Sequence, residues 1–204
     1  MTATSSTMNA SLRTALDRFG TDQLRRSSNR NSEDSQTVLF LCALTSVRSV
    51  MAKAILNHLA GGRFRALSAG SYPSGPINPL ALACLAAHGI PTAGLRGKGW
   101  CELVGLGAPK THFIIALCKE ASTEQMTSLP WHTPQYAHWD LPDPTLIGIN
   151  STERRQAFEK TFQLLTYRIE QFLTLPFDQL SPAALTQELS VIGALPFSLI
   201  HSCR

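Results

Sequence analysis

Cys42 and Arg48 lie six positions apart in the segment Cys42-Ala43-Leu44-Thr45-Ser46-Val47-Arg48-Ser49. The apolar run at residues 38–41 predicts a buried strand before this segment, and the apolar spacing after it predicts a helix. A loop that curls at the start of a helix points backbone N–H groups inward and binds tetrahedral oxyanions, which an arginine grips through two oxygens. The same positive field favours the nucleophilic thiolate of Cys42. We therefore predict an oxyanion-binding loop in which Cys42 is the nucleophile.

The groups that surround the anion are expected to come from one continuous stretch of the chain. Its members are Ala43, Leu44, Thr45, Ser46, Val47, Arg48 and Ser49. The alternative interpretation of Cys42 is a small, buried and unreactive cysteine at the end of a strand.

Two further candidate residues follow predicted strands. Residues 112–118, with an apolar run from Phe113, predict a strand that ends at Cys118, and residues 136–141 predict a strand that is followed by Asp143 of an Asp-Pro pair. The carboxyl ends of parallel strands share one edge of a sheet, so both residues are expected near Cys42. The proline restricts Asp143 to extended backbone, which suits a fixed proton donor. A core cysteine and an ordinary Asp-Pro turn are the alternatives.

Strands alternate with helices along the chain, and this order predicts an α/β fold in which helices cover both faces of a parallel sheet. The helix starts carry capping residues, Asn78 before Pro79 and Ser181 before Pro182. Gly193 is expected to end the last helix. The predicted strands are residues 38–41, 65–69, 112–118 and 136–141, and the predicted helices are residues 49–59, 78–89, 151–173 and 182–193.

The composition fits one globular domain of 204 residues, with 44% apolar and 16% charged residues. We predict a disordered leader at residues 1–36, a domain at 37–193 and a tail at 194–204. No apolar run approaches the roughly 20 residues of a membrane span, and no signal peptide is visible, so a cytoplasmic protein that does not bind membranes is expected. A net charge of +4 without an arginine-rich cluster in the body favours a small anion over nucleic acid as partner.

The five cysteines are odd in number and contain no Cys-x-x-Cys pair, and the six histidines are scattered. Neither a disulfide framework nor a metal site is expected, and no cofactor is implied. Cys84 and Cys101 are interpreted as structural.

Several other short stretches have distinctive sequences: residues 38–42, 48–56, 62–66, 68–71 and 94–96, Lys98, Trp100, His138-Trp139 and Pro142-Asp143-Pro144. With these stretches the chain resembles the low-molecular-weight protein tyrosine phosphatase superfamily, and within it the thioredoxin-coupled arsenate reductases. The resemblance implies a flavodoxin-like three-layer sandwich with a four-stranded parallel sheet. It also implies that Cys42 attacks arsenate, that Arg48 binds the oxyanion and that Asp143 protonates the leaving oxygen. Cys118 then attacks the sulfur of Cys42, which releases arsenite and leaves a disulfide.

Two differences from the family patterns bear on the activity. Thr145 and Leu146 follow the Asp-Pro pair, where phosphatases of the tyrosine class usually carry tyrosines that stack on the substrate ring. Together with Cys118, this favours arsenate reduction. The alternatives are a phosphatase that hydrolyses phosphate monoesters through a phosphocysteine, and a catalytically inactive oxyanion-binding protein.

The recycling thiol and the anion loop also depart from the pattern. The reductase branch usually has a third cysteine where Gln125 and Met126 stand, so the disulfide is expected to be reduced by thioredoxin, glutaredoxin or a small thiol, or with the help of Cys203. The family has Gly-Asn where this chain has Leu44-Thr45. A threonine in left-handed backbone costs about 1–2 kcal/mol, so a strained or reshaped loop is expected.

Overall fold

The computed structural model describes residues 35–44, 47–72, 75–103, 109–121 and 134–198. The predicted leader lies outside this range except for its last two residues, and so do Thr45, Ser46, Cys203 and the two positions of the missing third cysteine. Contacts along the chain group residues 36–204 into one compact unit. No helix in the described part of the chain is both long enough and apolar enough to span a membrane.

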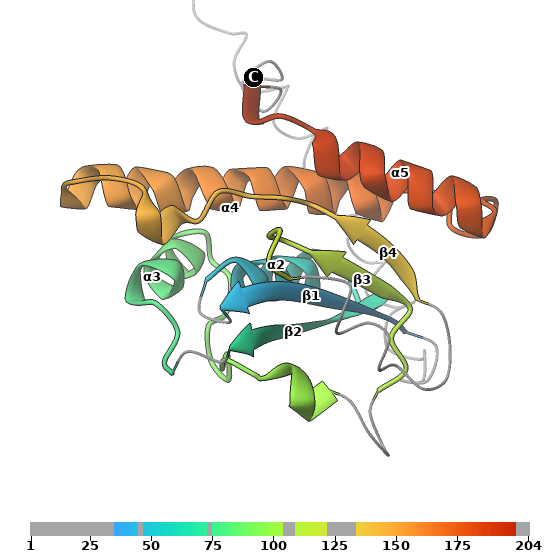
Figure 1. The fold of residues 1–204 in the computed structure, drawn as a ribbon, viewed down its shortest axis with the longest axis horizontal. Coiled ribbons are helices and arrows are strands. Elements are labelled where there is room, and N and C mark those ends of the chain that lie inside the picture. Colours follow the sequence, from blue (N-terminus) through green and yellow to red (C-terminus); the bar gives the residue numbers. More distant parts are fainter. Residues whose placement is uncertain (1–34, 45–46, 73–74, 104–108, 122–133, 199–204) are drawn as a thin grey trace, which may run out of the picture. The chain divides into compact units, whose positions relative to one another are not determined.

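The centre of the fold is a parallel sheet with the strand order β2-β1-β3-β4 (Figure 1). Residues 38–41 have exposed fractions of 2% or less, so both faces of β1 are covered, which explains its uninterrupted apolar run. The strands are β1 (Gln36–Leu44), β2 (Phe64–Tyr72), β3 (Phe113–Ala116) and β4 (Gln135–His138).

The helices begin where the capping residues predict. The side chain of Asn78 accepts a hydrogen bond from the N–H of Leu80, and that of Ser181 accepts one from Ala184. Pro79 and Pro182 occupy the first helical turns. The helices are α2 (Arg48–Leu59), α3 (Pro79–Ala87), α4 (Ser151–Thr174) and α5 (Pro182–Ala194), with 3-10 helices at Trp100–Leu103 and Pro144–Leu146.

Two groups of buried side chains lie on opposite faces of the sheet. Val38 and Phe40 belong to the larger group, which also contains buried residues of all four α-helices. Leu39 and Leu41 belong to the smaller group, in which the 3-10 helix Trp100–Leu103 contributes Leu103. Part of the connection between β3 and β4, residues 122–133, lies outside the described residues. The arrangement is a flavodoxin-like α/β fold, as the sequence predicts.

The prediction that Gly193 ends the last helix is wrong. This residue is buried within α5, which continues to Ala194. A Cβ atom at this position would lie 2.4 Å from the carbonyl oxygen of His138 and 2.6 Å from Cδ1 of Trp139. The absence of a side chain therefore lets α5 approach the end of β4, where Trp139 Nε1 donates a hydrogen bond of 2.8 Å to the carbonyl oxygen of Leu189.

Candidate functional site

The carboxyl ends of β1 and β3 lie side by side in the middle of the sheet. β1 pairs with β2 on one side and with β3 on the other, so this is the position at which the strand order reverses. In open α/β sheets such a position forms the binding crevice. Leu41 pairs with Ala116, and the N–H of Leu117 donates to the carbonyl oxygen of Leu41 at 2.8 Å. The chain therefore places Cys42 and Cys118 next to each other.

The two thiols form a hydrogen-bonded pair. The thiolate of Cys118 is stabilised first by a hydrogen bond from Cys42, then by the backbone N–H groups of Ala43 and Ala121, and further by the positive charge of Arg48. Ala43 donates at 3.1 Å to Cys118 Sγ. Against the opposing effect of burial, these groups lower the pKa of Cys118 from 9.0 to about 6. The site therefore lowers the pKa of the second cysteine, Cys118, whereas the sequence directs attention to Cys42.

This lowered pKa makes the stability of the protein depend on pH through Cys118. Between the folded pKa of about 6 and the ordinary value of 9.0, the unfolded thiol holds a proton that the folded one lacks. Folding stability therefore rises with pH across that interval, by at most about 1.4 kcal/mol per pH unit from this group, and the contribution is lost as the pH falls through the folded pKa. Cys118→Ser is expected to flatten the rise, measured by urea unfolding at several pH values.

Cys84→Ser is a matched control for that experiment. Burial, followed by the Glu159 carboxylate, raises the pKa of Cys84 to about 12, so its titration affects stability only above the interval tested. Equal pH slopes for the parent protein and Cys118→Ser would contradict a thiolate at position 118.

Arg48 joins the start of α2 to the loop after β4. Its Nη1 donates to the carbonyl oxygen of Leu141 at 2.8 Å, and its Nη2 lies 2.8 Å from Oδ2 of Asp143. The side chains of the ion pair are 9% and 17% exposed. Asp143 Oδ1 accepts hydrogen bonds from the backbone N–H and hydroxyl group of Thr145, and its backbone is extended, as expected before a proline. The structure thus brings together two of the residues singled out in the sequence, Arg48 and Asp143.

The segment after Cys42 differs from the predicted loop. β1 does not end at Leu41 but continues to Leu44, because Cys42 and Leu44 remain paired with Gly70 and Tyr72 of β2. Ala43 is therefore extended strand, and its N–H is directed to the Cys118 thiol. The next two residues of the predicted loop, Thr45 and Ser46, lie outside the described residues.

The remaining predicted anion ligands lie at the start of α2. Val47, Arg48 and Ser49 are all buried, with exposed fractions of 7% or less. The hydroxyl group of Ser49 has no hydrogen-bond partner among the described residues. A buried donor without a partner beside a helix start is suited to an incoming anion.

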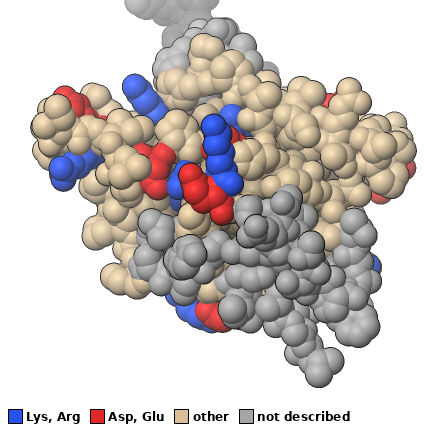
Figure 2. Space-filling view, in the orientation of Figure 1, with Lys and Arg blue, Asp and Glu red and all other residues tan. Residues whose placement is uncertain are grey.

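Basic residues also gather beside β2. Burial lowers the pKa of Lys53, and the positive charges of Lys98, Arg96 and Arg65 lower it further. Arg96 is itself paired with Glu102 at 2.9 Å in an exposed ion pair. On the face seen in Figure 2, lysine and arginine side chains of the described residues lie among acidic ones.

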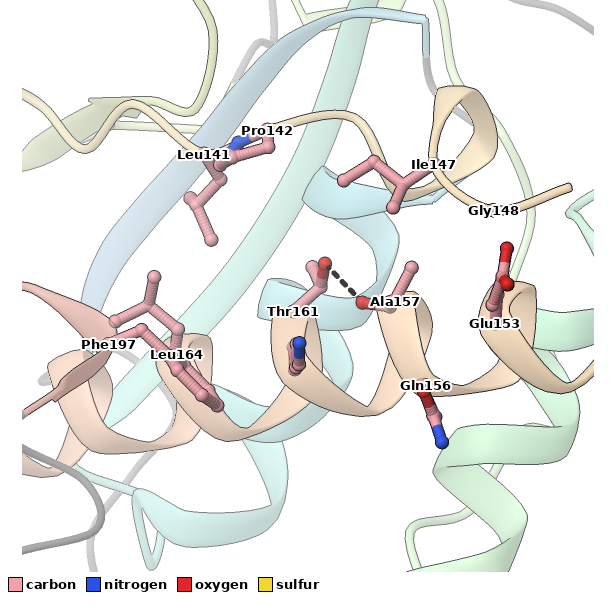
Figure 3. Close-up of a pocket in the computed structure, with 11 residues that line it drawn as sticks. Leu141, Pro142, Ile147, Gly148, Glu153, Gln156, Ala157, Thr161, Leu164 and Phe197 are labelled. Carbon is pink, nitrogen blue, oxygen red and sulfur yellow. Dashed lines mark hydrogen bonds between the residues drawn. The ribbon is translucent and has the colours of Figure 1, made fainter.

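A pocket of about 470 Å³ is lined by the loop that Arg48 holds. Leu141 and Pro142 form one wall, and Ala157, Thr161 and Leu164 of α4 form the opposite wall (Figure 3). The loop at residues 141–142 therefore both contacts Arg48 and lines this pocket. No sequence pattern indicates this pocket or the role of the Leu141 carbonyl group, because both depend on how the loop folds over α4.

Comparisons with known proteins agree with this geometry. The model of the family described as low molecular weight phosphotyrosine protein phosphatase matches residues 37–189. A search among curated proteins finds no sequence that matches the chain.

Solved structures of similar fold include the low molecular weight protein tyrosine phosphatase from T. tengcongensis, with 22% identity, a TM-score of 0.56, and coverage of 68% of this chain and 98% of that one. An arsenate reductase in the phosphate binding state has 21% identity and a TM-score of 0.53, with coverage of 68% and 96%. At these identities the likeness concerns the fold. The family match, which spans most of the chain, shows more: the chain belongs to the low molecular weight phosphotyrosine protein phosphatase family, a class of enzymes whose fold arsenate reductases share.

Proposed function

We propose that this protein is an arsenate reductase in which Cys42 and Cys118 are the redox pair. The observation that supports this proposal is the hydrogen bond between the two thiols at the reversal point of the sheet, where the surrounding groups lower the pKa of Cys118. Hydrolysis of a phosphate ester through a phosphocysteine needs one thiol, and a second thiolate in contact with it has no role there. Reduction needs a second thiolate that attacks the first sulfur.

The spacing of the strands also suits a disulfide between these residues. Neighbouring strands lie about 4.8 Å apart, and disulfides join Cα atoms that are about 4.4–6.8 Å apart. Cys42 lies in β1, one residue past Leu41, and Cys118 lies two residues past Ala116, which is the partner of Leu41 and the last residue of β3. The hydrogen bond between the two thiols already brings the sulfurs together, so we propose that the disulfide forms without a large movement of the backbone.

The proposed reaction proceeds in two covalent steps. Arsenate binds to Arg48 and to N–H groups at the start of α2, and the sulfur of Cys42 forms a bond to arsenic as one oxygen leaves as water. The Cys42 thiol proton and a proton held by Asp143 supply the two protons that this oxygen needs. The Cys118 thiolate then attacks Cys42 Sγ; the sulfur–sulfur bond forms, the sulfur–arsenic bond breaks, and its electron pair stays on arsenic, which leaves as arsenite.

Binding of arsenate requires the site to open. Cys42 is 1% exposed, and the Arg48 guanidinium group holds Asp143 and the Leu141 carbonyl group. These contacts use two of the five N–H donors of an arginine, so an oxyanion can share the guanidinium group or displace the Asp143 carboxylate. Displacement frees Asp143 to take up a proton, which a general acid needs.

The disulfide product must be reduced by a thiol from outside the pair. The chain has Gln125 and Met126 at the positions where the reductase branch carries its third cysteine. We therefore propose that thioredoxin, glutaredoxin or a small thiol attacks the Cys42–Cys118 disulfide directly. This chemistry requires reduced thiols, and it suits the cytoplasm.

Arsenate-dependent thiol oxidation tests the proposal. Cys42→Ser and Cys118→Ser are each expected to abolish the reaction with glutathione and glutaredoxin or with thioredoxin as reductant, whereas Cys101→Ser, the matched control, retains it. Hydrolysis of an aryl phosphate is measured in parallel. A phosphatase loses that hydrolysis with Cys42→Ser and keeps it with Cys118→Ser, so this pattern without arsenate reduction would replace the proposal. Absence of both activities in the parent protein would leave only an anion-binding role.

A further inference from the structure

Helices α3 and α4 bring together three side chains that the reaction does not use. Cys84 and His88 are four positions apart and lie one turn from each other on and just after α3, and Glu159 faces them from α4. The thiol sulfur, an imidazole nitrogen and a carboxylate oxygen all lie within 4.8 Å of one another. We propose that Cys84, His88 and Glu159 form a binding site for one divalent metal ion of the zinc type.

The distances between the donor atoms are close to those of a tetrahedral zinc site. His88 Nε2 lies 3.0 Å from the Glu159 carboxylate oxygens, and Cys84 Sγ lies 3.7 Å from Glu159 Oε2. Zinc bonds of about 2.3 Å to sulfur and about 2.0–2.1 Å to nitrogen and oxygen, at tetrahedral angles, separate these donors by roughly 3.3–3.6 Å. The Glu159 oxygens therefore need shifts of a few tenths of an ångström, whereas the Cys84 sulfur and the His88 nitrogen, which lie within 4.8 Å of each other, have to approach by up to about 1.2 Å.

Neighbouring groups already hold two of the donors in orientation. The His88 ring stacks on Phe162, with ring centroids 3.9 Å apart and 14° between the planes. Gln163 Nε2 donates to Glu159 Oε1 at 2.9 Å, so the other oxygen, Oε2, is directed toward Cys84. Partners that orient metal ligands in this way commonly raise metal affinity tenfold to about a hundredfold.

The cluster is open to solvent on one side. The side chains of His88 and Glu159 are 38% and 39% exposed. A pocket of about 420 Å³ lies beside it, lined in part by Cys84, Glu159 and Arg155. An ion can therefore enter from solvent, and its fourth position is left to water or to a small anion near Arg155.

The set of donors selects the class of metal. A thiolate with an imidazole and a carboxylate suits zinc or cobalt, whereas magnesium and calcium prefer oxygen donors throughout. When the sulfur–metal bond forms, the ion replaces the proton of the Cys84 thiol, and this proton is released to solvent.

This site is separate from the proposed redox pair. Cys84 packs against the larger core group, on the helix-covered face of the sheet, while Cys42 and Cys118 belong to the smaller group on the opposite face. Bound zinc is expected to connect α3 to α4 and to stabilise their packing.

Cobalt titration of the full chain tests the inference. The parent for this experiment is Cys42→Ser/Cys118→Ser, so that the redox pair does not bind metal. We expect one cobalt ion per chain with thiolate-to-cobalt charge-transfer absorption, displaced by zinc, and a zinc-dependent rise in the unfolding temperature. Adding Cys84→Ser abolishes the charge-transfer absorption, and adding His88→Ala or Glu159→Gln weakens binding at least about tenfold.

His58→Ala and Cys101→Ser are the matched controls and are expected to bind cobalt as the parent does. Circular dichroism checks that each variant is folded; His88 and Glu159 are partly exposed, so their variants report on the site even if the Cys84 variant is unstable. A charge-transfer band that survives Cys84→Ser, or binding that is unchanged by both His88→Ala and Glu159→Gln, would overturn the inference. The test does not depend on arsenate activity, so it can fail or succeed independently of the proposed function.

Discussion

Arg48→Lys is expected to lower kcat/KM for arsenate by at least about a hundredfold. The guanidinium group lies between the start of α2 and the loop after β4, and it contacts the Leu141 carbonyl group and Asp143 at once. An ammonium group is a point charge that cannot hold two oxygens of an oxyanion in a plane, so both the binding of arsenate and the position of Asp143 suffer. Steady-state kinetics with arsenate measures the loss.

Arg96→Lys is the matched control for Arg48→Lys. Arg96 is also paired with a carboxylate at 2.9 Å, but the two side chains are 60% and 42% exposed. Exposed pairs contribute about 0–1 kcal/mol, so this variant is expected to retain its activity within roughly twofold. Urea unfolding of both variants separates loss of activity from loss of folding. If Arg48→Lys kept its kcat/KM for arsenate within a few-fold of the parent value, Arg48 would not be the anion ligand.

Gly193→Ala is expected to lower the free energy of unfolding by about 3 kcal/mol. The added methyl group would lie 2.4 Å from the backbone oxygen of His138 and 2.6 Å from Trp139 Cδ1, so either α5 or the end of β4 has to move. Alanine stabilises a helix by about 1 kcal/mol relative to glycine. Helix propensity alone would therefore raise the free energy of unfolding, so a decrease has to come from the steric clash. Urea unfolding followed by circular dichroism measures the change.

Ala194→Gly is the control for that experiment. Ala194 is the exposed last residue of α5. Replacing it by glycine is therefore expected to lower the free energy of unfolding by about 1 kcal/mol or less, through helix propensity alone. An equal or greater stability for Gly193→Ala would show that the helix does not pack as closely on β4 as the structure indicates.

The main elements follow from local sequence. The apolar run of β1 and the capping pair Asn78-Pro79 are visible in the chain, and the rule for the ends of parallel strands places Cys118 beside Cys42. The end of β1 was not predictable in this way, because Leu44 stays in the strand through its pairing with Tyr72, which is distant in sequence. The packing role of Gly193 could not be predicted for a related reason. A glycine at the end of an amphipathic run is typical of a helix terminator, but here position 193 packs closely against His138 and Trp139, which are distant in sequence.

The types of the residues that meet at the candidate site could be predicted, but their charges could be predicted less well. The sequence identified Cys118, yet the lowered pKa at this residue depends on the Ala43 and Ala121 amides and on Cys42, which only the fold assembles. Cys84 and His88 are one helical turn apart, but the sequence analysis interpreted Cys84 as structural and predicted no metal site. Glu159 of α4 could not be linked to them without the structure, since helix packing sets which residues of α4 face α3.

The pocket behind residues 141–142 has a mechanical consequence for the site. Packed protein interiors resist displacement, because a shifted side chain has to compress its neighbours. Here the loop that carries Asp143 is held by Arg48 and also lines a hollow of about 470 Å³. Leu141 and Pro142 therefore have free space beside them, so the loop can move when the proposed oxyanion displaces Asp143 from the arginine.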